Sequence, residues 1–157
     1  MTKMRAAFTS TSPDETAQFA RRLGASLAAG DCLLLEGGIG AGKSHFARAL
    51  ILSRLREPED VPSPTFTLVQ TYDLPDGALW HADLYRLGDP DQIIELGLLD
   101  AIETDICLIE WPDRMGDLRP AGALTIRLDD PHKTDTREMT LSWTDPAWTP
   151  RVQEALA

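Results

Sequence analysis

One eight-residue segment constrains the fold of this 157-residue chain more than any other. Residues 37–44 read Gly-Gly-Ile-Gly-Ala-Gly-Lys-Ser and match the pattern G-x-x-x-x-G-K-[ST] at every fixed position. The apolar run 32–35 precedes this segment, and Phe46, Leu50 and Leu55 follow it as one helical face. The segment therefore predicts a buried strand, a phosphate-binding loop and a helix that begins at Lys43.

Each residue type in this loop has a physical reason to be there. Glycines allow successive backbone N–H groups to point at one anion, and the helix start adds its positive dipole end. Lys43 is expected to reach the β- and γ-phosphates, and the Ser44 hydroxyl is a hard oxygen ligand for Mg²⁺. A nucleoside triphosphate with Mg²⁺ is the expected ligand, and the loop residues expected to bind it are Gly38, Ile39, Gly40, Ala41, Gly42, Lys43, Ser44 and His45.

Two carboxylates are candidates for the metal and for catalysis. Glu110 directly follows the apolar run 106–109, which places it at the carboxyl end of a buried strand, where parallel sheets bind ligands. Asp83 ends the weaker apolar stretch 79–82. One carboxylate can hold the metal while the other orients the attacking water, and the alternative for each is a solvated or capping role.

Other residues near these positions leave two readings open. His81 lies two residues before Asp83, on the same strand face, and either contacts the site or is structural. Trp111 faces away from Glu110 if the strand continues, and it either covers a nucleotide or partner surface or packs in the core. No motif marks an adenine pocket, and the segment near Thr11 and Thr16 is our expectation for it.

The remaining pattern predicts one α/β domain over residues 1–157, with three layers. Ser12, Pro13 and Glu15 form a helix start with a capping box, and Gly30 is expected to end that helix. The second helix is expected to run to about Arg56. Strands are expected at 66–72, 78–84, 106–109, 124–128 and 139–143, and short helices at 90–97 and from Pro150 onward.

Composition narrows the location and the partners. The net charge is -10, from 15 Lys and Arg against 25 Asp and Glu, so any contact with RNA is expected to be delegated to a partner. The two cysteines, Cys32 and Cys107, lie in apolar runs and are expected to be buried free thiols. No apolar stretch approaches the ~20 residues that span a bilayer, so no membrane contact is expected and the cytoplasm is the default location.

Four segments together resemble the TsaE family, also called YjeE. They are GGIGAGKSHFARAL at 37–50, VPSPTFTLVQTYD at 61–73, HADLYRL at 81–87 and CLIEWPDR at 107–114. The resemblance covers about residues 12 to 143, and the second and third segments are far more specific than the phosphate loop. It departs from the family at His45, where a second Thr is usual, and at Gly38 or Ile39, where an acidic residue is frequent.

The resemblance implies a fold, an activity and partners. The fold is a P-loop NTPase-like domain with a mixed, mainly parallel central sheet. The activity is Mg²⁺-dependent ATP hydrolysis in the synthesis of threonylcarbamoyladenosine, beside the anticodon of tRNA. The family acts with the TsaB and TsaD proteins, and tRNA is met through that complex.

The resemblance also assigns roles to residues of this chain. The Mg²⁺ ligands map to Ser44 and Glu110, and Asp83 maps to an acidic residue needed for activity. Trp111 maps to the Trp of the family beside that Glu. The catalytic set is then Lys43, Asp83 and Glu110, and two mobile segments beside the nucleotide contain Ser63 and Thr65 in the first and Asp83 and Arg86 in the second.

Three rival functions make different demands on the sequence. A GTP-binding switch protein needs N-K-x-D after a late strand, and the chain has His-Lys-Thr-Asp at 132–135. A small kinase needs a basic lid, yet Arg86 is the only Lys or Arg between Asp60 and Asp105, although Arg114 and Arg119 follow. A non-catalytic binding module is the third reading, because no arginine finger is obvious; Arg86, Arg114 and Arg127 are the candidates, and stimulation by a partner is expected.

Overall fold

The computed structural model describes residues 2–132 and 134–157. The strands it shows are β1 (Met4–Ser10), β2 (Cys32–Glu36), β3 (Val69–Leu74), β4 (Gly77–Asp83), β5 (Ile106–Glu110), β6 (Leu124–Asp129) and β7 (Arg137–Trp143). The helices are α1 (Pro13–Gly24), α2 (Lys43–Arg54), α3 (Asp91–Glu95), α4 (Leu98–Thr104), the 3₁₀ segment η1 (Pro112–Leu118) and α5 (Trp148–Leu156).

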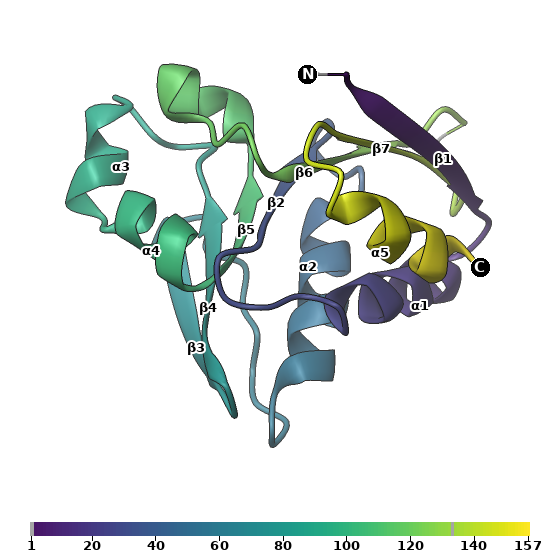
Figure 1. Ribbon diagram of the computed structural model, residues 1–157, viewed down its shortest axis with the longest axis horizontal. Coiled ribbons are helices and arrows are strands. Elements are labelled where there is room, and N and C mark those ends of the chain that lie inside the picture. Colours follow the sequence, from purple (N-terminus) through teal and green to yellow (C-terminus); the bar gives the residue numbers. More distant parts are fainter. Residues whose placement is uncertain (1, 133) are drawn as a thin grey trace.

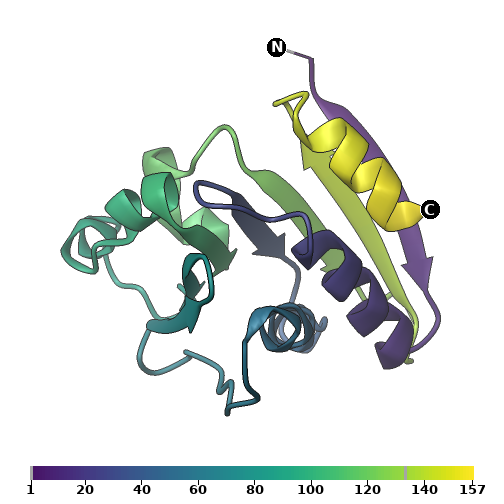
Figure 2. The ribbon, with the colours of Figure 1, turned by 60° about the horizontal axis from the view of Figure 1, so that its bottom comes forward.

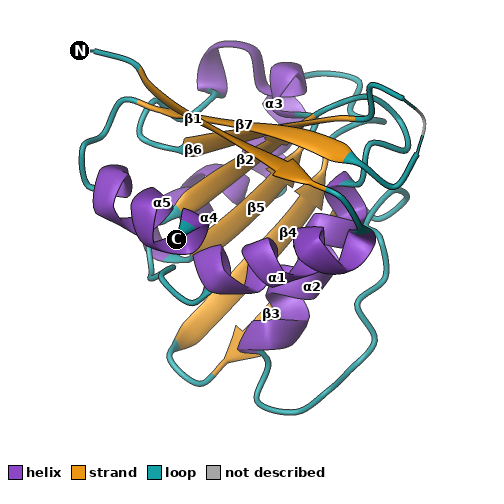
Figure 3. Ribbon diagram, turned by 90° about the vertical axis from the view of Figure 1, so that its right-hand side faces the viewer, coloured by secondary structure: helices purple, strands orange, loops and turns teal. Residues whose placement is uncertain are grey.

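The strands form one mixed sheet in the order β1-β7-β6-β2-β5-β4-β3 (Figure 3). The four central strands, β6, β2, β5 and β4, are mutually parallel. The pairs β1–β7, β6–β7 and β3–β4 are antiparallel and lie toward the two edges. The expected mixed, mainly parallel sheet is confirmed.

Helices cover both faces of the sheet, which gives three layers (Figures 1 and 2). One face packs against α1, α2 and α5, in a core that includes Phe19, Phe46 and Leu50. The other face packs against α3, α4 and η1, around Ile93, Leu98 and Met115. The middle strands β2 and β5 are apolar throughout because they are buried on both faces.

The structure differs from the sequence-based expectation at several elements. Strand β1 and helix α4 were not expected. Helix α1 ends at Gly24 rather than Gly30, and Leu27 lies in the turn that follows. The strand expected at 66–72 begins only at Val69, because Leu68 takes a left-handed conformation with φ 68°.

The parallel register brings the candidate site residues to one edge of the sheet. Leu35, the residue before the end of β2, aligns with Glu110, the last residue of β5. Glu110 in turn aligns with Asp83, the last residue of β4. The loop 37–42 leaves β2 at this same edge and leads into α2.

No helix within the described residues is long and apolar enough to cross a membrane. Cys32 and Cys107 are both buried and free, as expected from their apolar surroundings.

Candidate functional site

The loop between β2 and α2 has the backbone that its glycines predict. Gly42 caps α2 in a left-handed conformation with φ 104°. Gly37 has φ 141°, and a Cβ there would lie 2.4 Å from the carbonyl oxygen of Leu128. A side chain at position 37 would therefore push the loop away from β6, and only glycine fits the observed path.

Lys43 folds back over this loop. Its Nζ donates hydrogen bonds to the carbonyl oxygens of Gly37 and Gly38, at 2.6 and 2.9 Å. The same ammonium lies 4.1 Å from the centre of the Trp111 ring. Burial lowers the pKa of Lys43 below its ordinary value, and the nearby carboxylates of Glu110 and Asp83 oppose that shift.

Glu110 is the centre of a buried polar chain. The Ser44 hydroxyl donates to its carboxylate oxygens, at 3.1 Å to Oε1 and 3.3 Å to Oε2. His81 Nε2 lies 2.7 Å from Oε2, and both side chains are 2% exposed. The first-turn hydroxyl of α2, the end of β5 and a side chain of β4 thus meet at one carboxylate. The expectation that His81 contacts the site is confirmed by this geometry.

Asp83 is held beside this chain by different partners. Its Oδ2 accepts a hydrogen bond from the Thr65 hydroxyl at 3.3 Å, and its Oδ1 accepts the backbone N–H of Tyr85 at 3.0 Å. Thr65 in turn shares a 2.8 Å hydrogen bond with Ser63. Asp83 is 5% exposed, so its carboxylate is fixed at the inner wall rather than solvated.

Aromatic side chains form the outer wall. The chain turns sharply after Glu110, because Trp111 adopts a left-handed conformation with φ 57°. Trp111 therefore faces the loop instead of pointing away, and it meets Tyr85 edge to face at a centroid distance of 4.9 Å. Phe66 is 82% exposed, and the Arg86 guanidinium lies over its ring at 4.7 Å.

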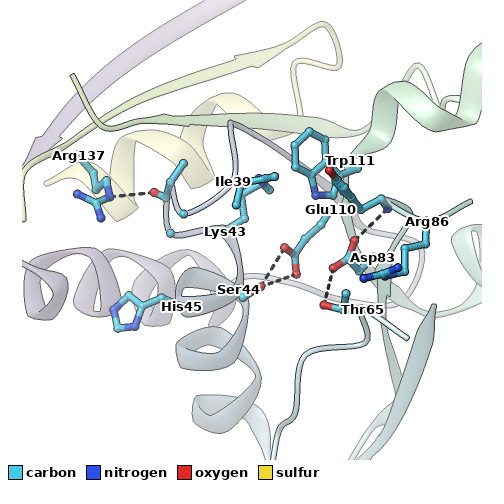
Figure 4. Close-up of a pocket in the computed structure, with 14 residues that line it drawn as sticks. Ile39, Lys43, Ser44, His45, Thr65, Asp83, Arg86, Glu110, Trp111 and Arg137 are labelled. Atoms are coloured by element: carbon cyan, nitrogen blue, oxygen red, sulfur yellow. Dashed lines mark hydrogen bonds between the residues drawn. The ribbon is translucent and has the colours of Figure 1, made fainter. Parts of the chain in front are cut away.

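These elements enclose a pocket of about 620 Å³ (Figure 4). Its lining comes from the loop, the start of α2, the ends of β4 and β5, and the start of β7: Ile39, Gly40, Ala41, Gly42, Lys43, Ser44, His45, Thr65, Asp83, Tyr85, Arg86, Glu110, Trp111 and Arg137. A pocket of this size accommodates a small organic ligand such as a nucleotide.

Most of the predicted site residues line this pocket, and three do not. Gly38 contributes its carbonyl to Lys43, and Ser63 contacts the pocket only through Thr65. Thr11 lies outside the lining, and its backbone N–H donates to Glu15 at the start of α1. Of the expected arginines, Arg86 lines the pocket, whereas Arg127 pairs with Asp129 and is 54% exposed.

Two lining residues were missed by the sequence analysis. Tyr85 lies within the segment that carries the resemblance, so its place between Asp83 and Arg86 was the available signal. Arg137 had no such signal, since it lies 96 residues from the loop residue that it contacts. The segment 132–135, considered above for guanine recognition, lies between β6 and β7, and its Lys133 is outside the described residues.

The oxygen donors at the loop fit a magnesium site of the phosphate-bound kind. Within residues 2–132 and 134–157, no cluster of three or more His, Cys, Asp or Glu side chains is placed to hold a metal ion. Mg²⁺ at a phosphate site needs only one or two protein oxygens, because phosphates and water supply the others. Ser44 Oγ and the Glu110 carboxylate, in direct contact at the loop, are such a pair.

Comparison with known proteins gives a consistent result. The family model described as "Threonylcarbamoyl adenosine biosynthesis protein TsaE" matches residues 10–139. A protein of Rickettsia bellii named "tRNA threonylcarbamoyladenosine biosynthesis protein TsaE" is 39% identical over 117 residues, which cover 74% of this chain and 81% of that protein. A protein of the same name from Mycobacterium bovis is 32% identical and covers 83% and 82%.

The fold is also similar to that of a solved structure. The crystal structure of Bacillus subtilis YdiB matches with a TM-score of 0.77 at 26% identity. The match covers 99% of this chain and 96% of that one. The similarity therefore includes β1 and α5, which lie outside the residues of the family match.

Proposed function

This chain belongs to the TsaE family of tRNA threonylcarbamoyladenosine biosynthesis proteins, and from that premise we propose that it is a Mg²⁺-dependent ATPase of this pathway. We propose further that it acts with TsaB and TsaD and meets tRNA only through them. The observation that carries the proposal is the contact of Ser44 with Glu110 beneath the phosphate loop, next to the fixed carboxylate of Asp83.

The loop supplies the phosphate site. The first N–H groups of α2 are free of intrahelical partners and point toward the pocket, so they attract anionic oxygens. Lys43 is buried against the carbonyls of Gly37 and Gly38, and its ammonium is already within the pocket lining. A small rotation of this side chain exchanges carbonyl partners for phosphate oxygens, which are stronger acceptors because they are charged.

Ser44 and Glu110 would hold the metal. When bound there, Mg²⁺ bridges phosphate oxygens and neutralises the charge that develops during phosphoryl transfer. His81 supports Glu110 from behind through the 2.7 Å contact, which fixes the orientation of the carboxylate. Glu110 therefore acts as a positioned ligand rather than as a mobile surface acid.

Asp83 is the group that orients the attacking water. It lies on the strand beside Glu110 but has separate partners, Thr65 and the N–H of Tyr85. Those two donors stabilise the ionised carboxylate, which is the form that accepts a proton from water. The split assigns the metal to Glu110 and the water to Asp83.

The partner proteins would complete the site. Arg86 lines the pocket, but its guanidinium stacks on exposed Phe66 and is held away from the loop. An arginine that reaches the phosphates raises phosphoryl-transfer rates by about 10³–10⁵ where it is available. Binding of TsaB and TsaD at the Phe66 segment would release or replace Arg86, so we propose slow hydrolysis by the isolated chain and faster hydrolysis in the complex.

The experiment that tests the proposal is ATP hydrolysis by the purified chain, alone and with TsaB, TsaD and tRNA. GTP is compared in parallel, Mg²⁺ is removed with a chelator, and Lys43→Ala is compared with Lys3→Ala, which alters an exposed lysine outside the pocket. We expect slow turnover alone, stimulation by the partners, dependence on Mg²⁺ and loss in Lys43→Ala only. Equal turnover with and without partners, or preference for GTP, contradicts the proposed role.

A further inference from the structure

Arg137 is a cation of the pocket that the proposed mechanism does not use. It is the first residue of β7 and aligns with Ser10, the last residue of β1. Its Nε donates a 2.9 Å hydrogen bond to the carbonyl oxygen of Ala41, within the phosphate loop. In Figure 4 it lies at the end of the pocket opposite Asp83 and Arg86.

The guanidinium is held firmly, yet it retains donors. Nη1 donates to the carbonyl oxygens of Thr134 and Thr136, at 2.5 and 3.1 Å, and pairs with Asp130 at 3.3 Å. Among the residues that the structure describes, Nη2 has no hydrogen-bond partner, and the side chain is 20% exposed. A planar, fixed guanidinium with a free edge binds a ligand with little further loss of side-chain entropy.

The sheet order shows which part of a nucleotide lies on this side. Strand β2, which leads into the loop, lies between β5 and β6. Glu110 and Asp83, the proposed metal and water carboxylates, both end strands on the β5–β4 side. The γ-phosphate must lie with them, so the nucleoside must leave the loop toward β6 and β7. His45 and Arg137 border that exit, and His45 Nε2 lies 2.9 Å from the carbonyl oxygen of Pro13.

We propose that Arg137 binds the nucleoside half of the nucleotide, through the face and free edge of its guanidinium. This inference rests on the proposed function, since it requires a nucleotide in the pocket. Arginine planes stack on purine bases without reading their edges, so the contact adds affinity for a nucleoside rather than choice of base. The expected gain is about tenfold in affinity, from the usual size of one stacking contact.

The test compares ATP with inorganic tripolyphosphate, which has the phosphates but no nucleoside. Calorimetric titration with each ligand, in Mg²⁺, gives dissociation constants for the wild type and for Arg137→Ala. We expect Arg137→Ala to weaken ATP about tenfold and tripolyphosphate less than twofold. Arg151→Ala is the matched control, because Arg151 is equally buried, pairs with Asp31 and stacks on Trp148 outside the pocket.

Each outcome separates the possible roles of Arg137. Equal weakening of ATP and tripolyphosphate shows that Arg137 only supports the loop through Ala41, and overturns the inference. Unchanged binding of both ligands overturns it as well. Arg137→Gln, which keeps a planar donor, is used if thermal unfolding shows that Arg137→Ala does not fold. Failure of the proposed function gives a different pattern, with Lys43→Ala binding both ligands as the wild type does.

Discussion

At the scale of single residues, the two carboxylates of the pocket differ in their partners and therefore in their expected mutant phenotypes. Asp83 accepts hydrogen bonds from Thr65 and from the N–H of Tyr85, and neither partner is a phosphate-loop residue. Replacement of Asp83 by Asn keeps the volume and an acceptor for Tyr85. It removes the negative charge that would take a proton from water.

We therefore expect Asp83→Asn to lower single-turnover ATP hydrolysis by about 10²–10⁴-fold while the dissociation constant for ATP changes little. Rapid-quench kinetics and calorimetric titration measure the two quantities. Thr65→Val is the companion variant, since it removes one donor to Asp83 and leaves the charge, and it should have a smaller effect. Loss of ATP binding in proportion to the loss of turnover would place Asp83 in the binding site instead.

His81 acts through Glu110, and its expected effect is on the metal. It is 1% exposed, and among the described residues its Nδ1 has no hydrogen-bond partner. Partners of metal-binding carboxylates commonly contribute 10–100-fold to metal affinity or activity, so we expect His81→Asn to raise the Mg²⁺ concentration for half-maximal turnover about 10–100-fold. His132→Asn, at an exposed loop position, is the control. An unchanged Mg²⁺ dependence would make His81 a packing residue only.

At the scale of elements, the sequence predicted those segments whose structure depends on local pattern. The run 32–35, the loop and α2 were identified correctly because burial on both faces and glycine geometry leave a clear signature. Strand β1 was missed because its burial alternates with small residues, and Ala6 and Ala7 give little contrast between its faces. Its pairing with β7, far away in sequence, is what makes it a strand.

Candidate site residues were predictable on the same terms. Glu110 and Asp83 were found because each ends an apolar run. The orientation of Trp111 could not be predicted, since it depends on a left-handed turn that a bulky residue rarely adopts. Arg137 reaches the pocket only because β7 lies beside β6 in the sheet, a pairing that no local pattern reveals.

The turn between β2 and α2 allows a direct test of this geometry. A Cβ at Gly37 would collide with the Leu128 carbonyl, whereas a Cβ at Gly38 meets nothing within 4 Å. We expect Gly37→Ala to lower the free energy of unfolding by at least ~2 kcal/mol, from strain at a positive φ and the collision. Gly38→Ala should be close to neutral. Urea denaturation measures both, and equal effects would contradict the described loop path.

The paired strands β2 and β5 determine how the two thiols respond to pH. Cys32 and Cys107 are aligned in register and buried. Burial raises the pKa of Cys107 from 9.0 to about 12, and it also raises the pKa of Cys32. The folded state therefore retains these protons above pH 9, where the unfolded state loses them, so the thiols contribute stability that declines as pH rises from about 9 toward 12.

Thiol reactivity measures the same property. Since the thiolate is the reactive form, we expect neither cysteine to react with a disulfide reagent at pH 8 in the folded chain. Both should react rapidly in denaturant. Rapid labelling of one thiol in the native chain would mean that β2 and β5 separate readily. Repetition with bound ATP would show whether the pocket edge of these strands is the part that opens.

At the scale of the whole molecule, charge determines how the chain meets RNA. The net charge of -10 gives long-range repulsion from a phosphate backbone, and the cations that face the pocket, Lys43, Arg86 and Arg137, are held by other contacts. Non-specific RNA affinity comes from many free Lys and Arg side chains that displace counterions, so an acidic chain gains little from that source. The chain therefore depends on its partners for any contact with tRNA.

We expect the isolated chain not to retain tRNA in filter binding at 150 mM salt, with a dissociation constant weaker than ~10⁻⁴ M. ATP hydrolysis by the chain alone should not respond to added tRNA. With TsaB and TsaD present, tRNA should be retained and turnover should respond to it, because the partners then supply the positive surface. Micromolar binding by the chain alone, weakening steeply with salt, would instead reveal a basic surface that overcomes the net charge, and tRNA would then be a direct ligand of this protein.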